Sequence, residues 1–89
     1  MKTIWKATLL PADSQKIEMP KNAKVLTVQP QKDNACMWFL CDPNAPTETR
    51  EFAVYGTNHI IDERFKKYVG TFQLYEGGLV FHVFERGEE

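Results

Sequence analysis

The chain has 89 residues, of which 43% are hydrophobic and 26% are charged, and its formal net charge is −1. This length supports one domain with a single modest core, and the composition is that of an ordinary soluble protein rather than a disordered one. No run of basic residues exceeds Lys66-Lys67. Nonspecific nucleic-acid binding is therefore disfavoured, because it needs a basic stripe.

The chain start and the apolar runs bear on localisation. Met1-Lys2 leads into a mixed strand rather than into the apolar core of a signal peptide. No apolar run approaches the ~20 residues that a membrane helix needs. We therefore expect a cytoplasmic protein without membrane association.

The first half of the chain carries strand patterns separated by turn residues. Thr3 to Leu10 is rich in β-branched and aromatic residues and stops at Pro11, and Gln15 to Met19 alternates as a half-exposed strand does. Ala23 to Gln29 is a third predicted strand. Pro30 is expected to limit it, because proline cannot donate a hydrogen bond into a central ladder.

The run Ala35 to Cys41 has no polar interruption and is predicted to be the most buried strand, covered on both faces. Cys36 and Cys41 point to opposite faces because their spacing is odd. Five extended residues span roughly 16 Å in total, whereas a disulfide allows only about 7 Å between the two Cα atoms. Both cysteines are interpreted as small buried hydrophobes, and no CxxC motif supports a metal site.

Thr47 to Tyr55 alternates and places Phe52 and Val54 inward. Arg50 shares this inner parity but lies near the strand start, where it is expected to reach solvent. The segment from Thr57 to Lys67 has no period of two. It is long enough for one short helical turn near residues 60–67 or for a functional loop.

Tyr68 to Glu85 reads as a hairpin with a two-residue turn, either Gly77-Gly78 or Glu76-Gly77, and both choices keep the same residues on the same faces. The turn expected first is Gly77-Gly78. This turn pairs Leu74 with Phe81, Phe72 with Val83 and Gln73 with His82. One face is then apolar and belongs to the core: Gly70, Phe72, Leu74, Leu79, Phe81 and Val83. The other face is half polar, and we expect a second sheet layer, a partner subunit or a ligand to cover it in part: Val69, Thr71, Gln73, Tyr75, Val80, His82 and Phe84.

Short strands about ten residues apart, joined by short turns, predict an all-β fold of residues 1–89. We expect a small antiparallel barrel or sandwich of six to seven strands, with at most one short helical turn near residues 60–67. No phosphate-binding glycine loop, GxSxG motif, HExxH motif or zinc spacing is present. We therefore predict no cofactor, no metal and no catalytic residue.

Polar side chains gather at the end of one strand and on the hairpin, where a small ligand or the backbone of a partner could bind. In the alternative interpretation, Thr57 and Asn58 satisfy the backbone of their own turn, and His82 contacts Gln73 or Thr71. Asp62 and Glu63 could act as acids only if the loop folds them beside His59. The candidate ligand- or partner-binding residues are Tyr55, Thr57, Asn58, His59, Gln73, Tyr75 and His82.

The sequence blocks IWK, IEMPKNAKVLTVQ, WFLCDPNAPTETREF, YGTNH, YVGTFQ and VFHVFE occur in this order. They resemble a family of short proteins of unknown activity that are encoded mainly by tailed bacteriophages and prophages. Asn58 stands where other members have glycine, and both residues tolerate a positive φ, so we expect the turn to be kept. The resemblance implies no catalytic residues. It implies a small phage-encoded protein in the cytoplasm of the infected bacterium.

Three functions follow as hypotheses. The first is a non-enzymatic module that binds a host or defence protein, and the same half-apolar hairpin face could form a homo-oligomer. The second is a protein that binds or sequesters a small ligand such as a nucleotide signal, in a pocket formed by Tyr55, His59, Tyr75 and His82 or at a subunit interface. The third is a minor enzyme that uses His59 with an acidic neighbour.

Overall fold

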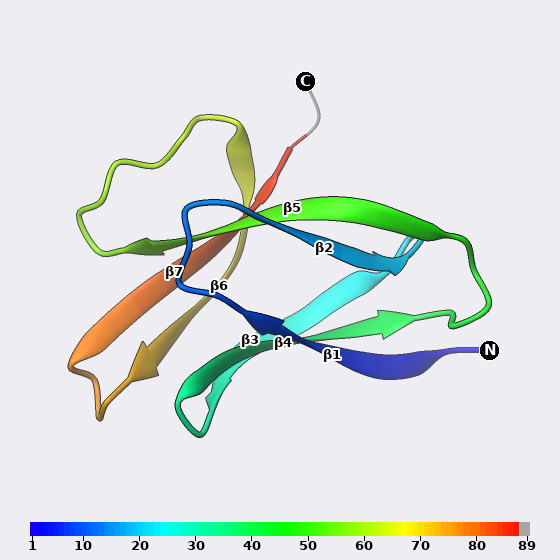
Figure 1. The fold of residues 1–89 in the computed structure, drawn as a ribbon, viewed down its shortest axis with the longest axis horizontal. Coiled ribbons are helices and arrows are strands. Elements are labelled where there is room, and N and C mark those ends of the chain that lie inside the picture. Colours follow the sequence, from blue (N-terminus) through cyan, green and yellow to red (C-terminus); the bar gives the residue numbers. More distant parts are fainter. Residues whose placement is uncertain (88–89) are drawn as a thin grey trace.

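The protein is all-β in the computed structural model, which describes residues 1–87. Within these residues there are seven strands and no helix (Figure 1). One antiparallel sheet has the strand order β1-β4-β3, and the other has the order β2-β5-β7-β6. The strands are β1 (Thr3–Leu9), β2 (Gln15–Pro20), β3 (Lys24–Gln31), β4 (Asn34–Cys41), β5 (Thr47–Gly56), β6 (Phe65–Leu74) and β7 (Leu79–Arg86).

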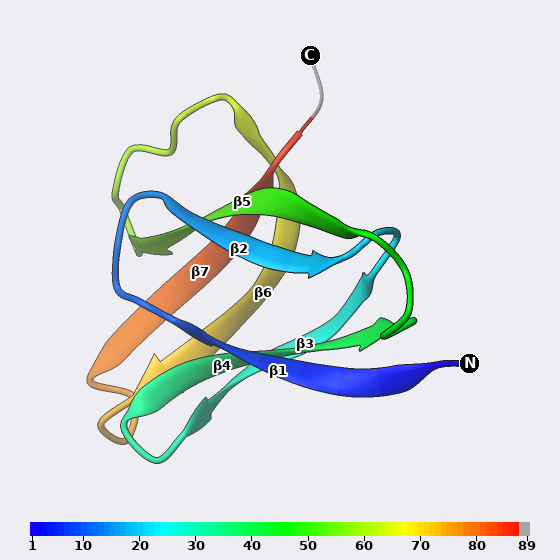
Figure 2. The ribbon, with the colours of Figure 1, turned by 45° about the vertical axis from the view of Figure 1, so that its right-hand side comes forward.

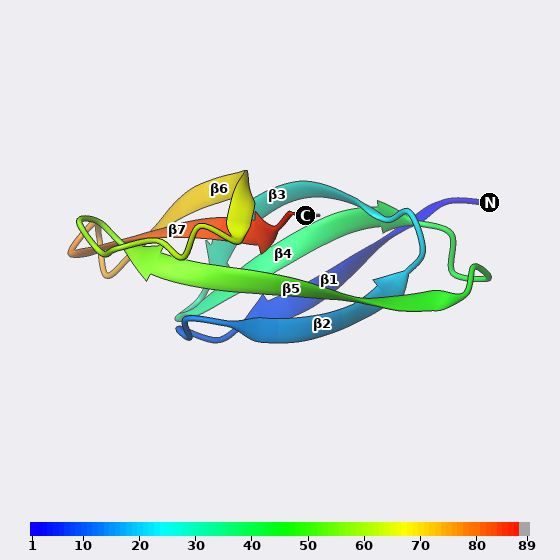
Figure 3. The same cartoon turned by 90° about the horizontal axis from the view of Figure 1, so that it is seen from above.

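The two sheets face each other across one core (Figure 2). Seen from above, β1 and β2 lie along one side of the molecule, and β3 and β6 lie along the other (Figure 3). The sheets are not closed into a barrel. The core takes inward side chains from all seven strands: Leu9, Met19, Val28, Met37, Phe39, Cys41, Phe52, Val54, Phe72 and Val83.

The most buried strand is β4, as predicted, and it is central in its sheet. Cys36 and Cys41 are both free and buried. Cys41 belongs to the core, whereas Cys36 pairs with Thr8 and Gln29 on the opposite face. The interpretation of both cysteines as small buried hydrophobes is therefore confirmed.

The predicted bounds of the first five strands agree with the structure within two residues. The largest difference is at Pro30, which does not end β3 but pairs with Ala35 of β4. Because β3 is at the edge of its sheet, a residue without an N–H group is tolerated there. The helical turn considered near residues 60–67 does not form, because β6 already begins at Phe65.

The hairpin of β6 and β7 forms in the register of the second predicted loop, Glu76-Gly77, which differs by two residues from the pairs expected for Gly77-Gly78. Phe72 pairs with Phe81 and Leu74 pairs with Leu79. The loop therefore has four residues, in which Tyr75, Glu76 and Gly77 all have positive φ. From Gly70 to Leu74 the side chains lie on the predicted faces of the hairpin, because a register change of two residues preserves side-chain parity.

Val69 and Tyr75 do not lie where the hairpin prediction puts them. A register shift between Tyr68 and Gly70 adds Val69 to one strand only, and Val69 packs against the core. Tyr75 lies in the loop rather than on the strand face that carries His82. A bulge and a loop of irregular φ thus explain both errors.

Phe52 provides a test of the shared core, because its side chain is fully buried. We expect Phe52→Ala to lower the free energy of unfolding by about 3–5 kcal/mol, since it removes apolar contacts and leaves a cavity. Urea denaturation followed by circular dichroism measures this change. The control is Ile60→Ala, because Ile60 is 95% exposed and its truncation should alter stability by less than about 0.5 kcal/mol. Equal effects of the two substitutions would contradict the assignment of the core.

Candidate functional site

The half-polar face of the hairpin is covered in part by the chain itself. Tyr55 and Phe65 are buried there, with their ring centroids 6.4 Å apart, and Phe84 packs against them. The loop of residues 57–64 binds back onto this cluster, because the Asp62 N–H donates to the Tyr55 hydroxyl at 3.3 Å. A segment of the same chain therefore takes the place that a partner or a ligand was expected to fill.

His82 lies in a chain of side-chain hydrogen bonds on this face. Its Nε2 atom is 2.9 Å from Thr57 Oγ1, and its Nδ1 atom is 3.0 Å from Thr71 Oγ1. Thr71 Oγ1 is also 2.5 Å from the Tyr68 hydroxyl. Both ring nitrogens thus have protein partners, and the expected contact with Thr71 is present. Gln73 lies beside the hairpin turn, where its Oε1 atom approaches Gly77.

His59 is held by the turn that contains it. The Gly56 N–H donates to His59 Nδ1 at 3.2 Å, and the His59 N–H donates to the Gly56 carbonyl at 3.2 Å. Asn58 has a φ of 74°, so the turn adopts the positive φ that was expected there. Tyr55 and His59 both line an open hollow of about 440 Å³.

The acidic residue closest in sequence to this histidine is already paired. Asp62 Oδ2 lies 2.6 Å from Arg64 Nη2, and Asp62 Oδ1 accepts the Arg64 N–H at 2.9 Å. These hydrogen bonds, above all the side-chain bond to Arg64, lower the pKa of Asp62 from 3.8 to about 2. A carboxylate that stays ionised in an ion pair is a poor proton donor, so this geometry does not favour an acid pair of His59 and Asp62.

An apolar hollow of about 200 Å³ lies at one end of the core, where β1 and β6 end and where β4 and β7 begin. We call it the end hollow. Three large apolar side chains on its wall are strongly exposed: Leu10 by 61%, Tyr75 by 66% and Leu79 by 45%. Buried or partly buried core residues form much of the remaining wall, namely Leu9, Ala35, Val54, Phe72, Leu74 and Phe81. Pro11, Asp33 and Asn34 line the rest of it.

Sequence reasoning found only Tyr75 as a candidate residue in the end hollow. Leu79 was placed correctly on the apolar face, but it stands at the strand end, where that face is open. The pair Leu9-Leu10 carried a usable signal. Adjacent residues of a strand point to opposite faces, so one of two consecutive leucines at the end of β1 has to leave the core.

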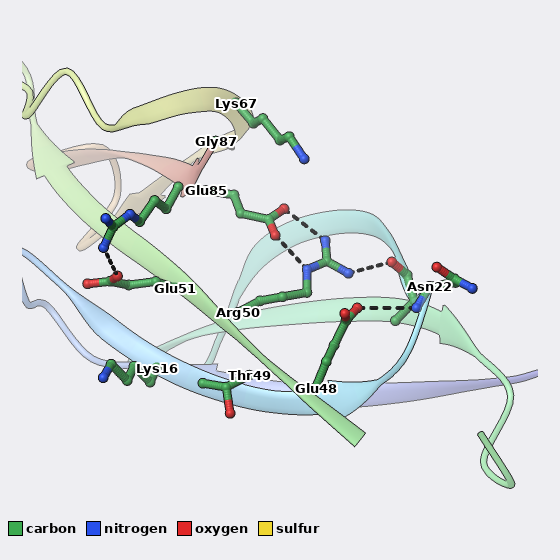
Figure 4. A pocket seen from close by; sticks show the side chains of 11 residues that line it. Lys16, Asn22, Glu48, Thr49, Arg50, Glu51, Lys67, Glu85 and Gly87 are labelled. Carbon is green, nitrogen blue, oxygen red and sulfur yellow. Dashed lines mark hydrogen bonds and ion pairs between the residues drawn. The ribbon is translucent and has the colours of Figure 1, made fainter. Parts of the chain in front are cut away.

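The opposite end of the core carries an ion pair that the sequence prediction missed. Arg50 Nε and Nη2 donate to the two carboxylate oxygens of Glu85 at 2.5 and 2.8 Å, and Arg50 Nη1 donates to the Ala23 carbonyl at 2.6 Å (Figure 4). The Arg50 side chain is 19% exposed and the Glu85 side chain is 10% exposed. Arg50 therefore reaches solvent only in part, because its guanidinium group is held by Glu85 and by the Ala23 carbonyl. The hydrogen bond to Glu85 raises the pKa of Arg50.

The hollow above this ion pair is wide, with a volume of about 720 Å³, and its carboxylates are paired. Glu51 accepts hydrogen bonds from Ser14 and from Arg86, which lower its pKa. Glu48 accepts the Asn22 N–H at 3.2 Å. Side chains of both charge signs line this hollow, so its charge favours neither an anion nor a cation.

Residues 1–87 contain neither a cluster of metal ligands nor a membrane-spanning helix. No group of three or more His, Cys, Asp or Glu side chains is placed to hold a metal ion in this part of the chain. None of its segments forms a helix that is long and apolar enough to cross a membrane.

The Asp62–Arg64 pair can be tested by titration. We expect Arg64→Gln to raise the pKa of Asp62 from about 2 toward 3.8, because the largest cause of the lowering is removed. The lowered pKa means that ionised Asp62 favours the folded state above about pH 4, and that this contribution is lost as the pH falls toward 2. NMR detection of the carboxyl carbon measures the pKa directly. Arg86→Gln is the control and should raise it less, because Arg86 acts on Asp62 only through its more distant charge. An unchanged pKa in Arg64→Gln would contradict the pairing.

Comparison with known proteins gives a family but no described activity. The sequence profile of a domain of unknown function (DUF7352) matches residues 1–89. Searches among curated proteins and among solved structures returned no match. The match spans the whole chain, and the protein therefore belongs to the DUF7352 family of unknown function.

Proposed function

We propose that this protein is a non-enzymatic binding module that holds another protein at its end hollow. The observation that carries the proposal is the exposure of Leu10, Tyr75 and Leu79 around one apolar hollow. Single exposed apolar residues are normal on protein surfaces, but a group of them around a concave site is typical of an interaction site. The resemblance to phage-encoded proteins suggests a host or defence protein in the bacterial cytoplasm as the partner.

The size of the end hollow supports a protein partner over a nucleotide. Pockets for drug-sized ligands measure about 300–1,000 Å³, whereas an apolar cavity of about 150 Å³ holds benzene. At about 200 Å³, the end hollow fits one aromatic or large aliphatic side chain. Buried side chains of this kind are the usual energetic centre of a protein interface.

The polar sites give less support to the other two functions. A phosphate in the hollow beside His59 would meet the carboxylates of Asp13 and Asp62, and Arg64 there is already paired with Asp62. The ring nitrogens of His82 are both occupied by threonine hydroxyls. A nucleotide or a proton-transfer reaction would have to displace these contacts, whereas an apolar side chain enters the end hollow without breaking a hydrogen bond.

Site-specific photo-cross-linking tests the proposal in infected or expressing cells. A photoreactive phenylalanine in place of Tyr75 should cross-link one defined host protein, because this position lies on the wall of the end hollow. The matched control is the same group in place of Ile60, which is also exposed and apolar but lines the hollow beside His59. Cross-linking from Ile60 and not from Tyr75 would reject the end hollow as the site.

Substitution of the wall then measures how much the contact contributes. Leu79→Asp should weaken binding of the cross-linked partner by about 2 kcal/mol or more, which is roughly 30-fold in Kd, because a charge would enter an apolar contact. Isothermal titration calorimetry with the purified partner gives this value. Ile60→Asp is the control and should leave Kd within about twofold. Similar Kd values for the two variants would reject the proposed contact.

A further inference from the structure

The four sheet edges of the molecule differ in how they are protected. β3 and β6 protect each other because they lie in contact, so closely that a Cβ added at Gly70 of β6 would touch the Val28 side chain of β3 at 3.5 Å. β2 carries the exposed charges Lys16 and Glu18 and ends at Pro20, which are features that prevent pairing with another strand. The fourth edge belongs to β1.

β1 has none of these protections along its outer edge. Within residues 1–87 it pairs only with β4, from Thr3 opposite Cys41 to Leu9 opposite Ala35. Two of its large apolar side chains are exposed, Ile4 by 55% and Trp5 by 43%. The charge of Lys6 does not guard the edge, because its Nζ atom donates to Gln31 Oε1 at 2.6 Å on β3, on the far side of β4.

We propose that the β1 edge pairs with β1 of a second copy of this chain, antiparallel and about a two-fold axis at Trp5. An antiparallel pair of identical strands is self-complementary under two-fold symmetry, so the second copy supplies the missing hydrogen bonds without a new sequence. The two three-stranded sheets then form one continuous sheet of six strands. This site lies along the side of the molecule shared by β1 and β2 (Figure 3).

Symmetry and charge together select the register. A two-fold axis through one residue pairs positions at equal distances on either side of it, so inward residues always lie opposite inward residues. An axis at Ile4 would set Lys2 opposite Lys6 of the second copy, and an axis at Lys6 would set the two Lys6 residues opposite each other. Like charges directly opposite are destabilising.

An axis at Ala7 would move the pairing past the end of β1. The Leu10 N–H and carbonyl are already bound by the Gln15 side chain at 2.9 and 2.8 Å, so the ladder would be shortened at that end. The axis at Trp5 sets Trp5 opposite Trp5, Ile4 opposite Lys6 and Thr3 opposite Ala7. It places no like charges together and leaves Leu10 and the end hollow free.

Light scattering over a concentration series and disulfide trapping test this inference. A strand pair of this length buries less surface than a standard interface, so we expect a weak dimer that dissociates on dilution. A mixture of Thr3→Cys and Ala7→Cys proteins should form a disulfide-linked dimer, because opposite Cα atoms lie about 4.5–5.5 Å apart, within the range of a disulfide. Neither variant alone should form this dimer, because the same cysteine in the second copy would lie about 13 Å away along the strand. Cys36 and Cys41 add little background because they are only 2% and 1% exposed.

The outcomes separate this surface from other modes of assembly. A dimer in light scattering together with cross-linking in the mixture only is the expected result. A monomer at every concentration overturns the inference. A dimer overturns it too if the mixture of the two variants does not cross-link, or if Thr3→Cys alone cross-links as well as the mixture does. If circular dichroism shows that a variant is unfolded, Lys2→Cys with Thr8→Cys provides a second opposed pair, with the same expected and contradicting results. The end hollow is not needed for this contact, so failure here leaves the proposed function standing.

Discussion

The ion pair between Arg50 and Glu85 closes one end of the core that the two sheets share. It joins β5 to β7 within one sheet and, through the Ala23 carbonyl, reaches the turn that leads into β3 of the other sheet. Removing one partner of a buried pair leaves an uncompensated charge, so the two residues stabilise this end only together. Among residues 1–87, no ion pair closes the opposite end. There Val54, Phe72 and Phe81 line the end hollow below Leu10, Tyr75 and Leu79.

The polar side chains of the candidate site make contacts within the fold, whereas the apolar side chains of the end hollow are exposed. The polar side chains that attract most attention, His59 and His82, use ring nitrogens to hold the turn after β5 and to connect β6 with β7. Tyr55 is buried under the loop of residues 57–64. The apolar groups of the end hollow are exposed and the outer edge of β1 has no partner strand within residues 1–87, and we propose both as contact surfaces for other polypeptides.

Much of the fold could be predicted because strands repeat every two residues. The inward positions of Phe52, Val54 and Phe72 follow from alternation alone, and they hold even where the hairpin partners differ. The choice between the loops Gly77-Gly78 and Glu76-Gly77 could not be made from the sequence, because Tyr75 and Glu76 adopt positive φ without being glycine. The ion pair was within reach of sequence reasoning, since Arg50 and Glu85 both share the inner parity of their strands. Their contact depends on the register of β5 against β7, which no local pattern specifies.

The most direct measurement is an NMR titration of the protein with indole, a probe of about the size that the end hollow can hold. If the open end of the core is the binding surface, the chemical-shift changes will saturate and will cluster on Leu10, Tyr75 and Leu79. Changes that cluster on His59 and Asp62, or a titration without changes at the end hollow, would contradict this assignment.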